Sequence, residues 1–305
     1  MHVEKYPRHC SLRSHRKIRL TSDLHESHIS HMTERKLSLL RIERLSHARG
    51  DIVSIILSDA KHKNALSTEM LTELRTALER LRAEISVRAV VLSADVGASG
   101  TPVFSSGHDL REVYGTTGTP GQLANLLSLC SAVCLLLQDM PQPTVALVDG
   151  LATAAGCQLA ASCDIVVATR RSTFATPGVR IGTFCSTPAV AISRCMQPKQ
   201  ALLMLLTGNA LSAEQAAASG LVTLVTEDAN TLWPCVMQIL DPILTAPAAT
   251  IARKREFYSQ LQMDRRHAFS FAERIMADDM HSAEGREGIG AFLGKRKPKW
   301  PAAKL

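Results

Sequence analysis

The chain has 305 residues, of which 46% are hydrophobic, an ordinary composition for a globular protein with a full core. Its formal charge of +7 is uneven: residues 1–49 hold eleven Lys and Arg against five Asp and Glu, and the remainder holds 24 against 23. A nearly neutral body with only two Trp and three Tyr argues against a nucleic-acid-binding surface built on basic charge and aromatic stacking.

The cysteines and the apolar runs limit the class of protein further. No C-x-x-C pair and no zinc-like spacing to histidine occurs, so we expect free, buried thiols in a reducing compartment and no metal site. No apolar stretch reaches the length of a membrane span, and the best candidate, Leu123 to Leu137, is expected to be a buried helix. The eight cysteines are Cys10, Cys130, Cys134, Cys157, Cys163, Cys185, Cys195 and Cys235.

Three regions differ in pattern. Residues 1–45 are basic and contain most of the histidines, which indicates either a transit peptide or a disordered extension. Residues 46–230 alternate strand-like and helix-like segments, which predicts an α/β core. Residues 231–305 follow a helical pattern and are expected to form a cap or an assembly element.

The expected elements follow from apolar periodicity and capping residues. Ser67 is an expected N-cap, because Met70, Leu71, Leu74, Leu78 and Leu81 follow it at helical spacing. Further helices are expected from Asp109–Leu110, over Pro120–Gln138, over Leu159–Cys163 and from Leu232 onward. Strands are expected at Asp51–Leu57, Arg88–Leu92, Val145–Val148, Ile165–Ala168, around Phe174 and at Val222–Val225.

Two turns of small residues, 102–110 and 149–163, each connect a strand to a helix. Backbone N–H groups are uncovered at such turns, and the helix dipole attracts negative charge. No Asp or Glu lies between Gly150 and Cys163. If the turns face each other, two N–H groups can meet one oxygen, which makes an oxyanion hole worth about 3 kcal/mol per donor.

Several ordered blocks resemble the crotonase (enoyl-CoA hydratase/isomerase) superfamily over about residues 45–300. The blocks are Asn64-Ala65-Leu66, Phe104 to Leu110, Gly150 to Asp164, Phe174 to Gly182 and Leu206 to Val222. The resemblance implies an α/β fold, with a ββα spiral core and a helical C-terminal region that packs between subunits. The expected assembly is therefore a homotrimer or a homohexamer.

The resemblance also implies a substrate and a site. The substrate is an acyl-CoA thioester of fatty-acid metabolism; coenzyme A is part of the substrate, and no cofactor is tightly bound. The thioester oxygen would meet the backbone N–H groups of His108 and Ala155, and the His108 side chain need not take part. Coenzyme A would contact Lys61, Asn64, Ala65, Leu66, Ser106, His108 and Lys295.

Departures from the family pattern leave the reaction open. That pattern has glutamates where this chain has Gln158 and Gly178. An amide can orient a water but cannot take its proton, and glycine offers no side chain. We therefore expect an enzyme with weak or altered hydratase or isomerase activity; the alternative is a non-catalytic protein that binds acyl-CoA or regulates lipid metabolism.

Substitute groups near the two turns are the side chains of Asp109, His108, Arg180, Cys185 and Ser186. A Ser-His-Asp hydrolase, suggested by Ser106-Gly107-His108-Asp109, is disfavoured because triads assemble from separated segments and no G-x-S-x-G is present.

The two ends of the chain indicate different compartments. The basic start favours mitochondria, whereas Ala303-Lys304-Leu305 resembles a peroxisomal address. We expect a mitochondrial protein and keep the peroxisome as the alternative.

Overall fold

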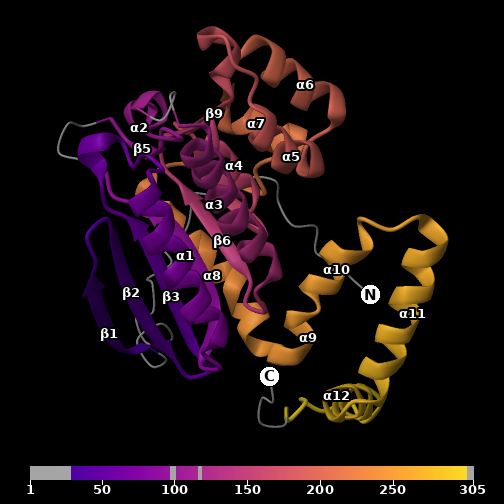
Figure 1. The fold of residues 1–305 in the computed structure, drawn as a ribbon. Coiled ribbons are helices and arrows are strands. Elements are labelled where there is room, and N and C mark those ends of the chain that lie inside the picture. Colours follow the sequence, from indigo (N-terminus) through magenta and orange to yellow (C-terminus); the bar gives the residue numbers. More distant parts are fainter. Residues whose placement is uncertain (1–28, 97–100, 116–118, 301–305) are drawn as a thin grey trace.

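Two sheets and their helices form the body of the protein, and a helical arm extends to one side of it (Figure 1). The computed structural model describes residues 29–96, 101–115 and 119–300. The terminal tripeptide 303–305 and the basic, His-containing segment before residue 29 lie outside the described residues.

The larger sheet has seven strands in the order β1-β2-β3-β4-β6-β8-β11. The first three strands are antiparallel neighbours, and β3, β4, β6, β8 and β11 run parallel. The strands are β1 Ile29–Lys36, β2 Leu40–His47, β3 Asp51–Leu57, β4 Val87–Ala94, β6 Thr144–Val148, β8 Ile165–Thr169 and β11 Leu224–Thr226.

A second sheet of four short strands has the order β10-β9-β7-β5. Its strands are β5 Val103–Ser105, β7 Leu151–Thr153, β9 Thr173–Ala175 and β10 Leu211–Ser212. In chain order, a strand of the large sheet is followed by one of the small sheet and then by helix, three times: β4-β5, β6-β7 and β8-β9. This repeat is the expected ββα spiral.

The chain turns from β6 into β7 at Gly150, which has a φ of +88°. A Cβ there would lie 1.9 Å from the carbonyl oxygen of Pro102, so only glycine fits this corner. The corner leads from β6 of the large sheet directly into β7 of the small sheet and lies against Pro102, the residue before β5.

Helices cover both faces of the large sheet. On one face, α1 contacts α3, and their apolar side chains join the main core. On the other face, α8 packs on β8, β11 and β4 around Ile52, Val91 and Val236. The helices of the body are α1 Thr68–Ala83, α2 Leu110–Gly115, α3 Pro120–Asp139, α4 Ala155–Ala161, α5 Ser186–Cys195, α6 Pro198–Thr207, α7 Ala213–Ser219 and α8 Ala229–Thr245, with 3₁₀ turns η1 Ala60–His62 and η2 Pro177–Ile181.

The sequence predicted most of these elements. Ser67 caps α1 as expected, because its side chain accepts a hydrogen bond from the Met70 N–H. The structure differs at four places. Paired strands begin at Ile29, inside the range assigned to an extension, and α4 begins at Ala155 instead of Leu159. The short strands β5, β7 and β10 were not expected, and neither were the helices α5, α6 and α7.

Helix α3 matches the expected Pro120–Gln138 and extends one residue further, to Asp139. Its segment Gly121–Asp139 has a mean hydropathy of 1.5, so by length and composition it could cross a membrane, and 33% of it is buried. The bent pair Ala229–Thr245 and Ala248–Gln260 passes the same test only when taken together. The expectation that no stretch reaches this length was therefore wrong. The buried face of α3, which includes Leu126, Val133 and Leu137, packs within the protein core.

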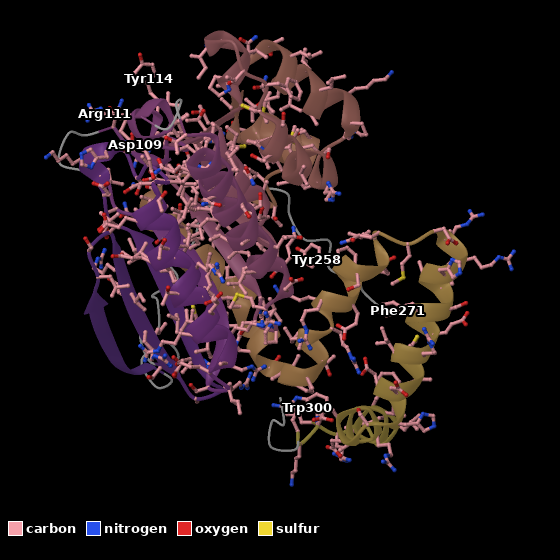
Figure 2. The ribbon with its side chains drawn as sticks, viewed as in Figure 1. Asp109, Arg111, Tyr114, Tyr258, Phe271 and Trp300 are labelled. Atoms are coloured by element: carbon pink, nitrogen blue, oxygen red, sulfur yellow. The ribbon has the colours of Figure 1, made fainter. Side chains whose placement is uncertain are left out.

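The C-terminal arm is anchored to the body by Asp164, at the start of β8. Its carboxylate accepts hydrogen bonds from Lys254 Nζ at 2.7 Å, from Tyr258 Oη at 2.8 Å and from the Thr144 N–H at 2.6 Å. Figure 2 labels Tyr258 on α10, the helix that contacts α3. Beyond it, α11 contains no buried residue. The arm consists of α9 Ala248–Ala252, α10 Lys254–Gln260, α11 Arg265–His281 and α12 Ala283–Leu293.

Candidate functional site

The first small-residue turn is held in place by the loop that precedes α1. Ser106 donates its N–H to the Lys63 carbonyl at 3.0 Å, and Leu66 donates its N–H to the Gly107 carbonyl at 2.8 Å. The Ser105 hydroxyl donates to the Asn64 carbonyl at 2.8 Å and accepts the Gly107 N–H at 3.2 Å. This pairing fixes the path of the backbone up to His108.

The second turn carries backbone strain at the start of α4. Ala154 has φ +51° and ψ −121°, a conformation that costs a non-glycine residue on the order of 1–3 kcal/mol. It persists because the Ala154 N–H donates to the Ala175 carbonyl at 2.9 Å. A Cβ at Gly156 would lie 2.4 Å from the Ser105 carbonyl oxygen, so the first turn of α4 rests directly on β5.

The structure brings the two turns together, as the sequence predicted. A Cβ at Gly107 would lie 2.9 Å from the Ala154 Cβ and 3.1 Å from the Ala155 nitrogen. Within the described residues, neither the His108 N–H nor the Ala155 N–H has a hydrogen-bond acceptor. Two uncommitted donors therefore lie on adjoining turns, one of them at a helix N-terminus.

The His108 side chain points back into the protein. Its Nδ1 lies 3.2 Å from the Leu66 carbonyl oxygen, so Nδ1 carries the proton and donates. Its Nε2 is buried, with no partner in the described part of the chain. Burial lowers the pKa of His108, although the bond to Leu66 and the negative charge of Glu112 oppose this. The ring is therefore neutral at pH 7.

Gln158 is 3% exposed and lies against helix α3. Its Nε2 donates to the sulfur of Cys134 at 3.5 Å, and its Oε1 is buried without a hydrogen-bond partner among the described residues. An unpaired buried amide oxygen is costly, and a water or a ligand hydroxyl would satisfy it.

Gly178 lies at the start of η2, where the space for a side chain is already filled. A Cβ there would lie 2.8 Å from both the Cys185 sulfur and the Thr183 carbonyl oxygen. The Gly178 N–H donates to the Cys185 sulfur at 3.3 Å. The missing side chain is thus replaced by a thiol from the start of α5.

Most of the residues expected to contact coenzyme A lie in or beside the first turn, and they differ in exposure. Lys61 is exposed beside the first turn, and Ser106 is half-buried within it. Ala65 and Leu66 are buried. The Asn64 side chain is buried too, and it donates a hydrogen bond to the Val103 carbonyl at 2.8 Å.

Lys295 is not brought to the other members of this set. It follows α12, which lies at the far end of the body from α2 and β5 (Figure 1). One chain alone therefore does not place Lys295 with Lys61 and Ser106.

The expected substitutes for the missing carboxylates are mostly committed elsewhere. Asp109 lies immediately before α2 and accepts the Arg111 N–H at 2.9 Å (Figure 2). Arg180 donates to the Asn209 side chain at 2.7 Å, and the Ser186 hydroxyl donates to the Phe184 carbonyl at 3.4 Å. Cys185 remains, buried against Gly178.

None of the seven described cysteines forms a disulfide, and burial raises the pKa of the Cys157 and Cys163 thiols, so neither forms a thiolate at neutral pH. In the ranges that the structure describes, no three His, Cys, Asp or Glu side chains form a group able to hold a metal ion.

Three residues that shape the site were not predicted from the sequence. Ser105 ties the first turn to Asn64, Cys134 meets Gln158 from 24 positions away, and Ala154 carries the strained φ. Only Ser105 had a local signal, as the serine before the turn. A long-range contact and a positive φ at alanine leave no pattern in one sequence.

Comparison with known proteins agrees with this architecture. Residues 47–303 match the sequence profile of the enoyl-CoA hydratase/isomerase family. The chain is 43% identical over 250 residues to mitochondrial enoyl-CoA hydratase domain-containing protein 3 of Mus musculus, covering 82% of this chain and 81% of the relative. It is 43% identical over 257 residues to the same-named protein of Danio rerio, covering 84% and 86%.

Solved structures show the same fold. An enoyl-CoA hydratase of Mycobacterium smegmatis superposes with a TM-score of 0.80 at 40% identity, covering 87% of this chain and 99% of the other. Human enoyl coenzyme A hydratase domain-containing protein 3 superposes with a TM-score of 0.76 at 38% identity, covering 88% and 99%. The chain belongs to the enoyl-CoA hydratase/isomerase family.

Proposed function

We propose that the chain binds an acyl-CoA thioester and holds its carbonyl oxygen between the N–H groups of His108 and Ala155. The observation that carries this proposal is the contact of the two turns, with a Cβ at Gly107 only 3.1 Å from the Ala155 nitrogen and both N–H groups uncommitted in the described chain. Family membership supports the thioester as the ligand.

The chemistry would be stabilisation of an enolate. Polarising the thioester carbonyl acidifies the α carbon and activates the β carbon of an enoyl group. Each preorganised donor contributes about 3 kcal/mol to holding the developing charge. The strained Ala154 and the backbone contact of Gly156 with Ser105 keep the donors fixed before substrate arrives.

Acid–base chemistry is the weak part of this site. Gln158 can hold a water through Oε1 but cannot accept its proton, and Gly178 contributes no side chain. We propose that hydratase activity is weak or altered. The second candidate, a non-catalytic acyl-CoA-binding or regulatory protein of lipid metabolism, is favoured by the Cys185 sulfur in the space beside Gly178.

The oxyanion contact can be tested on the ligand, without changing the protein. Butyryl-CoA has the carbonyl oxygen and S-butyl-CoA, a thioether, does not. Two hydrogen bonds of about 1 kcal/mol each predict roughly 30-fold tighter binding of the thioester. Equal affinities would refute the oxyanion hole, and absence of binding by either compound at millimolar concentration would refute the acyl-CoA site.

A protein variant gives an independent test of one donor. Ala155 is the first residue of α4, a position that tolerates proline within a helix. Ala155→Pro removes one of the two N–H groups and should reduce the thioester preference from roughly 30-fold to about 5-fold while the thioether still binds. Because proline also restricts Ala154, circular dichroism and urea unfolding must show that the fold is kept.

Catalysis is tested with crotonyl-CoA hydration by the wild type and by Gln158→Glu. A carboxylate at this 3%-exposed position would have a raised pKa and could accept a proton from water. A gain of at least tenfold over a slow wild type would support the proposal. A wild type that turns over as fast as an efficient hydratase would refute the claim that the missing carboxylates limit it.

We also propose a mitochondrial protein with coenzyme A only as part of the substrate, assembled as a homotrimer or homohexamer. The relatives from mouse and zebrafish carry the word mitochondrial in their names, which supports the location. Exposed apolar side chains on α11, such as Phe269 at 65% and Met276 at 59%, support burial of the arm against another subunit.

A further inference from the structure

A cavity of about 500 Å³ lies where the end of α1 meets the beginning of the C-terminal arm. Three of its residues are arginines, and none is acidic. Its walls come from the last turn of α1, the α3–β6 connection, α9 and the start of α10; the residues are Arg82, Ala83, Ile85, Pro141, Ala249, Ala252, Arg253 and Arg255.

Two of the three guanidinium groups lack an anionic partner. In the described chain Arg82 makes no side-chain hydrogen bond or ion pair, and Arg255 donates only through Nε, to the Ala252 carbonyl at 3.3 Å. Arg253 is neutralised by Glu256 and Asp279, at 3.0 and 2.7 Å. Arg82 and Arg255, both solvent-exposed, therefore carry two positive charges that form no ion pair with a described carboxylate.

A fourth arginine adds positive charge next to the cavity. Arg88 lies behind Pro141 and lines a smaller adjoining cavity. It is half-buried and donates to the carbonyls of Ala246 and Arg49, at 2.7 and 3.1 Å, with no acidic partner in the described ranges. The nearest acid in sequence, Glu84, pairs with Arg44 and Arg80 instead.

We propose that this cavity binds a phosphate monoester that carries a compact apolar group. A phosphate monoester has a charge near −2 at pH 7, which matches the two unbalanced guanidinium groups. Guanidinium groups bind phosphate oxygens in pairs, which favours arginine over lysine at such sites. Ile85, Pro141, Ala249 and Ala252 supply the apolar wall for the rest of the ligand.

This site is separate from the proposed thioester site. The first turn of α1 lies beside Glu112 and the His108 loop, because Thr68 donates its N–H to the Glu112 side chain. The cavity lies at the other end of the helix, which has 16 residues and is therefore about 24 Å long. The proposal thus does not depend on acyl-CoA binding.

The test is isothermal titration of the full chain with phenyl phosphate, inorganic phosphate and benzoate. Wild type should bind phenyl phosphate with a Kd on the order of 1 mM or tighter. Inorganic phosphate lacks the apolar group and benzoate lacks the second charge, so each should bind at least several-fold more weakly. Arg82→Gln/Arg255→Gln should weaken phenyl phosphate binding at least tenfold.

The matched control is Arg75→Gln/Lys199→Gln, which removes the same charge from exposed positions outside the cavity and should bind like wild type. Failure of wild type to bind phenyl phosphate, or equal binding by the Arg82/Arg255 variant, would overturn the proposal. Benzoate binding as tightly as phenyl phosphate would overturn the assignment to phosphate. Circular dichroism shows whether each variant keeps the fold.

Discussion

The sulfur of Cys185 lies 2.8 Å from the point where a side chain at Gly178 would begin. The two residues are also joined by the Gly178 N–H, which donates to that sulfur at 3.3 Å. Restoring a carboxylate at position 178 is therefore not a simple addition of a side chain.

Gly178→Ala should destabilise the protein by about 2 kcal/mol, because the added methyl group meets the thiol and the Thr183 carbonyl. Urea unfolding measures the loss. Cys185→Ala in the same chain should recover part of it, since the sulfur can be removed but the carbonyl cannot. Gly121→Ala, where no atom lies within 4 Å of the added Cβ, is the control and should cost nothing. Wild-type stability of Gly178→Ala would contradict the steric explanation.

Ala154→Gly should stabilise the protein by about 1 kcal/mol. Its φ of +51° and ψ of −121° strain an alanine but not a glycine, and the gain exceeds the extra entropy of the unfolded glycine. Ala155→Gly, inside the helix, should have the opposite effect. Thermal and urea unfolding distinguish the two variants, and a loss of stability in Ala154→Gly would show that the turn is unstrained.

Stability should fall below pH 6.5 in part because of His108. Burial lowers its folded-state pKa, whereas the unfolded chain binds a proton near the ordinary value of about 6.5. The stabilisation is therefore complete above pH 6.5 and is lost as the pH falls through the folded-state pKa. His108→Leu should flatten the dependence of unfolding free energy on pH below about 6.5. An unchanged slope would mean that other groups dominate.

Breaking the ion pair between Asp164 and Lys254 should strongly destabilise the protein. Lys254 and Asp164 are 2.7 Å apart, with side chains only 13% and 14% exposed. Lys254→Met leaves a buried carboxylate without its cation, at a cost of about 3 kcal/mol. The double variant Lys254→Met/Asp164→Asn should cost less than Lys254→Met alone, because the charge is gone while the Tyr258 and Thr144 donors keep an acceptor. A double variant less stable than the single one would contradict this account.

The helical arm gives a prediction about assembly. Phe269→Glu/Met276→Glu places two charges on the exposed apolar face of α11. If that face is buried between subunits, the variant should become a monomer in light scattering, while Arg265→Glu/Arg274→Glu on the same helix should assemble more nearly like wild type. A wild type that is itself monomeric would refute the proposed oligomer.

The long strands and the helices α1 and α3 could be predicted because their signals are local, whereas the short strands β5 and β7 were not predicted, and the ββα spiral was expected only from the family resemblance. Periodicity located α1 and α3, and the Ser67 cap set the start of α1. The two turns were recognisable from their small residues, and their contact was expected. The contacts that define the site were not predictable. Cys134 against Gln158 and Cys185 against Gly178 depend on packing between segments, and an amide or thiol side chain does not specify its partner in advance.

Gly156 packs directly against the Ser105 carbonyl, and this contact affects how proteins with this fold can diverge. The two donor turns are held by main-chain contacts and by glycines, none of which uses the side chains at positions 158 and 178. Acid and base groups can therefore be lost or exchanged in a lineage without disturbing the proposed thioester site. Ligand binding and catalytic activity can therefore change independently of each other in this fold.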